Sequence, residues 1–231
     1  MSTTTEQRAA SRGSGRDRPD APEGIRNHRL SRPYYEAAKR VMDLVLCLML
    51  LPVVLPVLAL CAAAIWLEDP GPVFFMQTRT GRFGRRFRMY KLRTMVTNAE
   101  ELKEQLRHLN ELTWPDFKLT HDPRVLKVGA FLRKTSLDEL PQIFNVIRGE
   151  MSLVGPRPTS FSSDTYTLWH TERLEVLPGI TGLWQVSGRS DVDFDDRLRL
   201  DIEYIRRRNL WFDIVLLART VLAVIRPKGA Y

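Results

Sequence analysis

Residues 44–67 read LVLCLMLLPVVLPVLALCAAAIWL, and this stretch decides the architecture of the chain. Its 24 residues carry no charged side chain, which exceeds the roughly 20 residues that a straight helix needs to cross a hydrocarbon core. Pro52 and Pro56 interrupt it four residues apart, on nearly the same helix face. Each proline removes a backbone hydrogen bond and crowds the preceding turn, so we expect the helix to kink or break there.

Basic residues flank this apolar segment on both sides. Lys39 and Arg40 precede it, and Arg79 and Lys91 are among the many that follow it. Lys and Arg near a membrane segment tend to stay on the cytoplasmic side, and both flanks cannot do so if the helix crosses the membrane. We therefore predict a re-entrant helix that enters the membrane, bends at Pro56 and returns. A kinked helix that spans the membrane is the alternative.

Composition and charge divide the chain into three parts. Its 231 residues are enough for one domain with appendages, and the net charge of +8 favours anionic partners such as phospholipid headgroups or nucleotides. Residues 1–35 are rich in Ser, Gly, Pro and Arg, which predicts a disordered basic tail. Residues 36–68 hold the membrane-embedded helix, and residues 69–231 are expected to form a cytoplasmic domain at the membrane surface.

Cysteine and histidine give no sign of a zinc site or a disulfide framework. Both cysteines, Cys47 and Cys61, lie inside the apolar segment, and the four histidines are scattered without the spacing of metal ligands.

The rest of the chain alternates short strand patterns and helix patterns. Residues 73–75 and 87–91 look like two short strands joined by a turn that contains glycine and arginine. The mostly apolar segment 210–225 either lies in the membrane interface or packs inside the domain. Helices are predicted over residues 98–112, 136–147, 163–176 and 195–207, a short helix or strand over 124–133, and a turn over 178–182. The predicted fold class is α+β and mostly helical, with a re-entrant membrane helix, a small cytoplasmic domain and interfacial amphipathic helices.

The chemistry of the chain concentrates in residues 135–158, which read TSLDELPQIFNVIRGEMSLVGPRP. Asp138 and Glu139 are adjacent carboxylates at the start of a short helix. The pattern from Ser136 to Glu139 fits a capping box, and acidic residues are common in a first turn because they complement the helix dipole. Pro141 favours a start nearer Asp138, since deeper in the helix it would lack a needed N–H. Capping and catalysis both stay open for this pair.

Two adjacent carboxylates suit phosphoryl transfer. One can attack phosphorus or hold a divalent ion, while the other positions or neutralises charge. The oxygens of a transferred phosphate need positive charge nearby. The candidates for supplying it are Lys91, Arg93, Arg157 and Arg189. Pro156 and Pro158 fix the backbone on either side of Arg157, so its guanidinium is presented with less loss of entropy. These features together indicate phosphate transfer at a membrane surface.

Several sequence blocks occur here in the order seen in one known family. They are residues 39–43 (KRVMD), 71–81 (GPVFFMQTRTG), 90–95 (YKLRTM), 136–142 (SLDELPQ), 149–158 (GEMSLVGPRP), 178–189 (PGITGLWQVSGR) and 200–204 (LDIEY). On these blocks the chain resembles the small monotopic phosphoglycosyl transferases of the bacterial sugar transferase family. The resemblance covers about Lys39 to Tyr231.

The resemblance implies a transferase that moves a sugar 1-phosphate from a UDP-sugar to polyprenol (undecaprenyl) phosphate and releases UMP. It implies that Asp138 attacks the β-phosphate and forms a phosphosugar-enzyme, and that Mg²⁺ is held at Asp138 and Glu139. The expected substrate-binding residues are Arg79, Lys91, Arg93, Pro156, Arg157, Pro158, Arg189 and Asp201. Relatives of this size serve exopolysaccharide or capsule assembly, so the expected place is the bacterial inner membrane, with the catalytic domain on the cytoplasmic face.

The resemblance also bears on the membrane helix and on partners. The family's helix breaks at a Ser-Pro pair, which is Leu55-Pro56 here, so the serine is absent and Pro52 is a second source of a kink. The chain lacks the extra N-terminal membrane helices of larger relatives, so we expect the minimal catalytic form. Membrane lipids are expected partners, nucleic acid is not, and a homodimer stays open.

Two rival functions remain at this point. A membrane-anchored basic protein that binds acidic lipid or nucleic acid without catalysis would explain the charge and the apolar segment. It would not explain Asp138 and Glu139 beside the Pro156-Arg157-Pro158 corner. A direct glycosyl transfer would release UDP instead of UMP, so the released nucleotide separates the two enzyme hypotheses.

Overall fold

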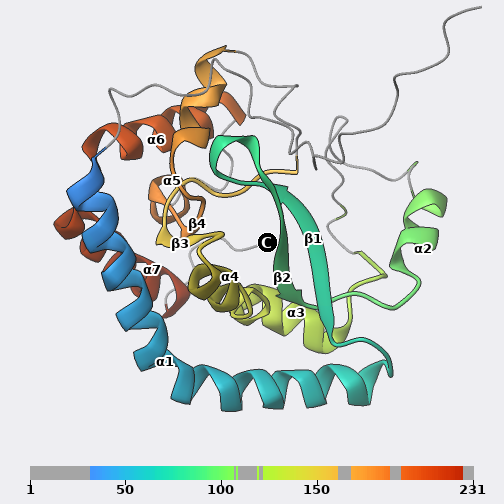
Figure 1. The fold of residues 1–231 in the computed structure, drawn as a ribbon. Coiled ribbons are helices and arrows are strands. Elements are labelled where there is room, and N and C mark those ends of the chain that lie inside the picture. The colour runs from blue at the N-terminus through green and yellow to red at the C-terminus, as the bar shows by residue number, and fades with distance from the viewer. Residues whose placement is uncertain are drawn as a thin grey trace, which may run out of the picture.

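The computed structural model describes residues 32–106, 108, 119, 122–160, 168–187 and 194–225. Within these residues the fold is α+β and mostly helical, as predicted (Figure 1). The α-helices are α1 (Pro33–Glu68), α2 (Ala99–Gln105), α3 (Lys127–Lys134), α4 (Gln142–Arg148), α5 (Leu183–Val186), α6 (Phe194–Arg207) and α7 (Leu210–Ile225). The 3₁₀ helices are η3 (Arg82–Gly84), η5 (Leu137–Glu139) and η7 (Leu168–Glu175), and the strands are β1 (Phe74–Thr80), β2 (Arg86–Leu92), β3 (Ser152–Val154) and β4 (Gly179–Thr181).

Helix α1 is a single 36-residue helix that runs through Pro52 and Pro56. Its ribbon changes direction sharply near the middle (Figure 1), and both prolines lie in this central part. The expected kink is therefore a bend within a continuous helix, as proline produces when it removes a backbone hydrogen bond. The path of this helix through a membrane, including a break at Leu55-Pro56, stays a prediction.

The exposure of its apolar surface distinguishes α1 from the core helix of a soluble protein. Among the described residues it is the helix long and apolar enough to cross a membrane, and 22% of its most apolar 18-residue window is buried. A soluble core helix would be mostly buried. The side chains that α1 does bury form a stripe at helical spacing against the rest of the protein: Asp43, Cys47, Val54, Leu58, Cys61 and Ile65.

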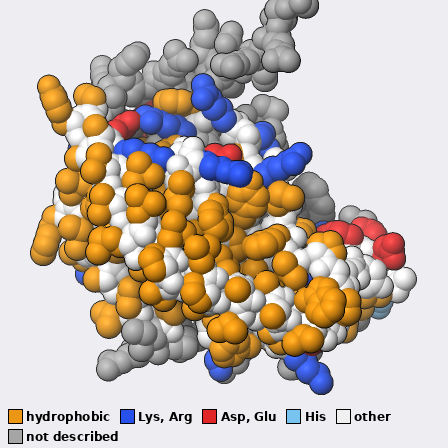
Figure 2. Space-filling model, turned by 60° about the horizontal axis from the view of Figure 1, so that its bottom comes forward, with side chains coloured by type: hydrophobic (Ala, Val, Ile, Leu, Met, Phe, Trp, Pro, Cys, Tyr) orange, Lys and Arg blue, Asp and Glu red, His pale blue; other side chains and the backbone are white. Residues whose placement is uncertain are grey.

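Many large hydrophobic side chains of the described chain are exposed. They come from α1, the start of β1, α3 and α7, and include Leu48, Met49, Val53, Leu60, Trp66, Phe74, Phe75, Met76, Phe131, Trp211, Val221 and Leu222. Figure 2 shows one face of the molecule covered by hydrophobic side chains, with Lys and Arg along its border. Apolar surface on this scale marks a membrane or protein interaction site. We call it the apolar face.

Helix α7 confirms one of the two expectations for residues 210–225, packing against the domain, while its place in a membrane interface stays a prediction. Asp213 and Leu216 are completely buried against the domain, whereas Trp211 is 72% exposed. The helix therefore packs inside the domain on one side and presents its other side outward.

Strands β1 and β2 form the predicted antiparallel hairpin, which is longer than the sequence pattern suggested. The register pairs Phe75 with Lys91 and Arg79 with Phe87. The turn between the strands contains Phe83 at a φ of 57°. Lys91 lies near the end of β2, where the hairpin contacts the η5 segment.

Strands β3 and β4 form a short parallel pair. Residues 178–182 were expected to form a turn only, but Gly179–Thr181 pairs with Ser152–Val154. The glycines allow this close approach, because a Cβ atom at Gly179 would lie 2.1 Å from the backbone nitrogen of Gly155. Residues 155–158 follow β3 directly, and the Gly155 amide continues the pairing by donating to the Thr181 carbonyl at 2.9 Å.

The expected helix over residues 136–147 is divided in two. Ser136 has a left-handed backbone with φ 57° and makes no side-chain cap, so the predicted capping box is wrong. Residues Leu137–Glu139 form η5, Pro141 is the N-terminal cap of α4, and Gly149 at φ 80° ends α4. Pro141 thus occupies the tolerated position at a helix start. Residues 168–175 are a 3₁₀ helix and not an α-helix.

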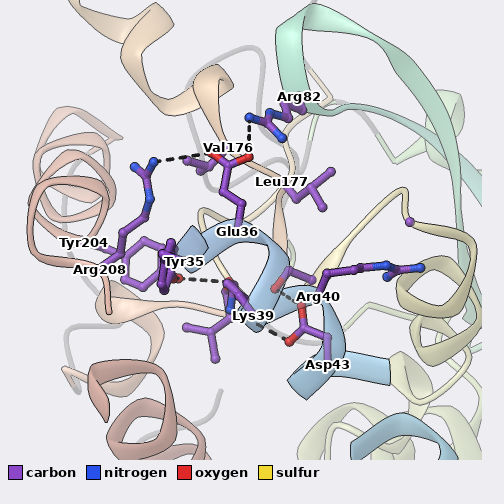
Figure 3. Close-up of a pocket in the computed structure, with 13 residues that line it drawn as sticks. Tyr35, Glu36, Lys39, Arg40, Asp43, Arg82, Val176, Leu177, Tyr204 and Arg208 are labelled. Carbon is purple, nitrogen blue, oxygen red and sulfur yellow. Dashed lines mark hydrogen bonds and ion pairs between the residues drawn. The ribbon is translucent and has the colours of Figure 1, made fainter. Parts of the chain in front are cut away.

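A buried polar network fastens the beginning of α1 to the domain. The Lys39 ammonium lies 3.0 Å from the Asp213 carboxylate, and the hydroxyls of Tyr35 and Tyr204 each donate to Asp213 at 2.7 Å. One turn further, Asp43 accepts a hydrogen bond of 2.6 Å from the Ser152 hydroxyl. Figure 3 shows Tyr35, Lys39, Asp43 and Tyr204 beside a cavity of about 320 Å³ between α1 and the domain. The network fixes how α1 sits on the rest of the domain.

Candidate active site

The acidic pair lies in η5, between α3 and α4. Asp138 is 8% exposed, and within the described part of the chain its carboxylate has no hydrogen-bond or ion-pair partner. The left-handed residue Ser136 turns the chain out of α3 immediately before the pair. The geometry therefore presents a buried carboxylate whose lone pairs are not engaged.

Glu139 is clamped by two cations from distant segments. Lys91 of β2 donates to its Oε1 at 2.8 Å. Arg157 donates through Nη2 to Oε1 at 2.5 Å and through Nη1 to Oε2 at 3.2 Å. Burial alone would raise the pKa of Glu139, but Arg157 and Lys91 outweigh it and lower the pKa to about 2. Glu139 is therefore ionised at neutral pH.

Asp138 has the opposite electrostatic environment. Burial raises the pKa of its carboxyl above the ordinary value of 3.8, and the negative charge of Glu139 raises it further, while Lys91 and Arg133 oppose the shift. Two neighbouring carboxyl groups whose pKa values are pushed apart are typical of sites where each group has its own task. Asp138 is available for reaction, whereas Glu139 holds two cations.

The Pro156-Arg157-Pro158 corner follows β3 and delivers Arg157 to Glu139. The carbonyl of Pro156 accepts a hydrogen bond of 2.9 Å from the Gly179 amide, which ties the corner to β4. The carbonyl of Arg157 accepts a hydrogen bond of 2.5 Å from Arg173 of η7. The arginine is therefore held both by its side chain and by its backbone.

A sequence model of the bacterial sugar transferase family matches residues 34–227. The chain belongs to this family. It is 46% identical over 201 residues to the undecaprenyl-phosphate galactose phosphotransferase of Salmonella typhimurium, covering 84% of this chain and 41% of that protein. It is 40% identical over 206 residues to the UDP-glucose:undecaprenyl-phosphate glucose-1-phosphate transferase of Escherichia coli, covering 84% of this chain and 41% of that protein.

One relative aligns with this chain over nearly the full length of both proteins. The exopolysaccharide production protein ExoY of Rhizobium meliloti is 40% identical over 207 residues, which is 87% of this chain and 91% of that protein. The chain thus spans less than half of the larger relatives and most of the smaller one. The acidic pair and the Pro156-Arg157-Pro158 corner both lie within residues 34–227, which the family model matches.

The structure brings together Lys91, Asp138, Glu139 and Arg157, as the sequence predicted. It gives other contacts to the remaining predicted binding residues. Arg93 pairs with Asp69 at the end of α1, and Arg79 donates to Gln77 at 2.5 Å. Asp201 is 1% exposed and pairs with Arg173 at 2.7 Å. Arg189 lies outside the described residues. The binding roles of these four residues stay predictions.

Two arginines near the site were not singled out from the sequence. Arg133 lies in the last turn of α3, donates to the Thr94 hydroxyl at 2.9 Å and acts electrostatically on Asp138. Its place in the last turn before the acidic pair was the available signal. Arg173 lies in a segment predicted as an ordinary helix, and no local pattern marked it.

Asp138 and Glu139 are the residues that would hold Mg²⁺, in a site that the substrate phosphates would complete. Among the described residues no group of three or more His, Cys, Asp or Glu side chains could enclose a metal. Mg²⁺, however, is usually bound by one or two carboxylates together with substrate phosphates and water. Asp138, with its unengaged oxygens, and the ionised Glu139 meet that requirement.

Proposed function

We propose that this protein transfers a sugar 1-phosphate from a UDP-sugar to undecaprenyl phosphate and releases UMP, as the first membrane step of exopolysaccharide assembly. The observation that carries the proposal is the buried, unpartnered carboxylate of Asp138 beside Glu139, Lys91 and Arg157. The names of the Salmonella and Escherichia coli relatives, which state undecaprenyl phosphate as the acceptor, support the same reaction.

In the first step, an oxygen of Asp138 attacks the β-phosphorus of the UDP-sugar. A new bond forms between this oxygen and phosphorus, while the bond between the β-phosphorus and the oxygen bridging to the α-phosphate breaks. UMP leaves with that bridging oxygen, and the sugar phosphate remains on Asp138 as an acyl phosphate. A carboxylate without hydrogen-bond donors suits this role because its lone pairs are not engaged.

In the second step, a phosphate oxygen of undecaprenyl phosphate attacks the same phosphorus. The acyl-phosphate bond to Asp138 breaks and regenerates the carboxylate, and the product is an undecaprenyl diphosphate sugar. Splitting the reaction into two displacements lets a water-soluble donor and a lipid acceptor use the site in turn.

The surrounding charges stabilise the phosphate oxygens. Arg157 and Lys91 already meet at Glu139, so both cations are held next to the attacking carboxylate before substrate arrives. Such preorganised cations stabilise charge that develops on phosphate oxygens. Mg²⁺ at Asp138 and Glu139 would supply further positive charge to the donor diphosphate.

The apolar face indicates where in the cell the proposed reaction would occur. We propose that the exposed side chains of α1 and α7 enter the cytoplasmic leaflet of the bacterial inner membrane, with α1 following a re-entrant path. The bend of α1 and the basic border of the face support this arrangement. It would hold the acidic pair at the level where the phosphate of a membrane lipid meets water.

Nucleotide release tests the proposed function. Purified protein in detergent is incubated with Mg²⁺, undecaprenyl phosphate and a set of UDP-sugars that begins with UDP-galactose and UDP-glucose. Release of UMP that requires the acceptor supports the proposal and names the sugar. Release of UDP would assign direct glycosyl transfer, and the absence of nucleotide release with every donor would contradict the transferase proposal and favour a non-catalytic membrane protein.

A further inference from the structure

A continuous chain of contacts leads from helix α6 to the acidic pair. The carboxylate of Asp201 accepts a hydrogen bond of 2.7 Å from Nη2 of Arg173. The same nitrogen donates to the backbone carbonyl of Arg157 at 2.5 Å. The guanidinium of Arg157 then holds Glu139 through two nitrogens. Asp201 lies in α6 and Arg173 in η7, so neither belongs to the segments that carry the carboxylates.

The corner needs support of this kind because its prolines cannot donate backbone hydrogen bonds. Its segment is tied to the domain through carbonyl oxygens instead. The Pro156 carbonyl accepts from the Gly179 amide at 2.9 Å, and the Thr159 carbonyl accepts from the Thr80 amide at 3.0 Å. Arg173 supplies the contact between them, at the carbonyl of Arg157 itself. The direction of the Arg157 side chain therefore depends on Arg173.

The burial of the ion pair between Arg173 and Asp201 indicates that the pair serves to orient a side chain more than to stabilise the fold. The Arg173 and Asp201 side chains are 6% and 2% exposed, and Oδ1 of Asp201 is buried without a hydrogen-bond partner in the described chain. A buried ion pair with an unsatisfied oxygen contributes little net stability, because the loss of hydration offsets the attraction. The ion pair does hold the guanidinium of Arg173 in one orientation. Both side chains are engaged with each other, and Arg173 also contacts the corner.

We infer that Arg173 and Asp201 are positioning residues that act on the transferase reaction through Arg157. Asp201 orients Arg173, Arg173 holds the Arg157 carbonyl, and the corner then aims the Arg157 guanidinium at Glu139 and at the donor phosphate. This inference rests on the proposed transferase function, and it assigns to α6 a task in setting the site.

A double-mutant cycle tests whether the effect of Arg173 passes through Arg157. We expect Arg173→Met to lower the kcat for UMP release on the order of tenfold, as for other residues that orient an active-site group. In an Arg157→Met background the same change should lower it by less than about twofold, because the residue it positions is gone. An equal tenfold loss in both backgrounds, or no loss in either, would overturn the inference.

A matched control separates positioning from general damage. Arg124 pairs with Asp122 at 2.7 Å and is 4% exposed, so Arg124→Met removes a similar buried ion pair near α2. Its effect on kcat should be the same with or without Arg157. If Arg173→Met does not fold, Asp201→Asn takes its place, since it keeps the shape and removes the charge that orients Arg173. The same lack of additivity with Arg157→Met is expected.

Hydrogen exchange gives a readout that needs no activity. The amides of Gly179 and Thr80 bond to the Pro156 and Thr159 carbonyls, so their exchange rates report whether the corner is held. Arg173→Met should accelerate exchange in peptides covering both amides, and Arg124→Met should not. Unchanged exchange in Arg173→Met overturns the inference even if the transferase proposal holds. Accelerated exchange in a protein that releases no UMP supports the contact chain while the transferase proposal fails.

Discussion

Arg157 and Glu139 form a two-pronged ion pair, with Nη2 2.5 Å from Oε1 and Nη1 3.2 Å from Oε2. This pair joins the corner after β3 to the 3₁₀ turn that carries Asp138, and Lys91 adds a second cation from the hairpin. The three segments meet at one carboxylate. Glu139 is thus the structural centre of the site, and Asp138 beside it keeps its oxygens for chemistry.

Replacing Arg157 by lysine tests the geometry of this pair. Lysine keeps the charge but cannot form two parallel hydrogen bonds to one carboxylate. We expect Arg157→Lys to lower the kcat for UMP release on the order of 100-fold. Arg199→Lys on the exposed surface of α6 is the control, because its side chain is 73% exposed, and it should match the unaltered protein. Equal rates for both variants would show that charge alone suffices.

Asp138→Asn should make the folded protein more stable at neutral pH. The folded-state pKa of Asp138 is raised by burial, so the folded protein binds this proton more tightly than the unfolded chain. Ionisation of Asp138 therefore lowers stability as pH rises above the unfolded value of 3.8. Thermal unfolding at pH 7 should give a higher Tm for the variant, and the difference should vanish as pH falls below about 4. A lower Tm at pH 7 would contradict the assignment.

Glu139→Gln should have the opposite effect. The pKa of Glu139 falls from 4.5 in the unfolded chain to about 2 in the folded protein, so its stabilising contribution is fully present above pH 4.5 and is lost as pH falls toward 2. The variant should lose about 3 kcal/mol of unfolding free energy at pH 7. Denaturant unfolding between pH 7 and pH 3 checks this, since the gap between the two proteins should narrow with acid. A constant gap would mean that the loss does not come from the ionised carboxylate.

The fold was predictable where local chemistry governs it. The uncharged run that forms α1, the strand patterns around Phe75 and Lys91, and the glycine that ends α4 were all visible in the sequence. The capping box was not a cap, because Ser136 adopts a left-handed backbone that turns the chain out of α3. The turn at Gly179 became a strand because β3, far away in the sequence, supplies its partner.

The sequence indicated which types of residue form the site. It indicated less well which individual basic and acidic residues meet there. Lys91 and Arg93 are two residues apart and equally basic, yet Lys91 lies within β2 and reaches Glu139, whereas Arg93 follows the strand and turns to Asp69. Asp201 sits on a helix whose composition suggests a solvated surface, but its side chain is buried and pairs with Arg173 of η7. Such choices depend on tertiary packing, which no local pattern encodes.

The re-entrant path of α1 predicts that both chain termini lie on the cytoplasmic side. A tag at either end should be cleaved by protease only after the inner membrane is permeabilised, because both flanks of the apolar segment would stay inside. Permeabilised cells provide the control for access to each tag. A tag at one end that is cleaved in intact spheroplasts while the other is protected would establish a spanning helix.

The proposed reaction depends on a covalent sugar phosphate on Asp138, and transfer of a radiolabel would detect this intermediate. The protein is incubated with a UDP-sugar labelled at the β-phosphate, without acceptor, and then with undecaprenyl phosphate. We predict that the label appears on the protein, that it is absent from Asp138→Asn, and that the acceptor removes it into lipid. Two results together would contradict the covalent mechanism. The label would pass to lipid at the same rate in Asp138→Asn, and it would never appear on the unaltered protein.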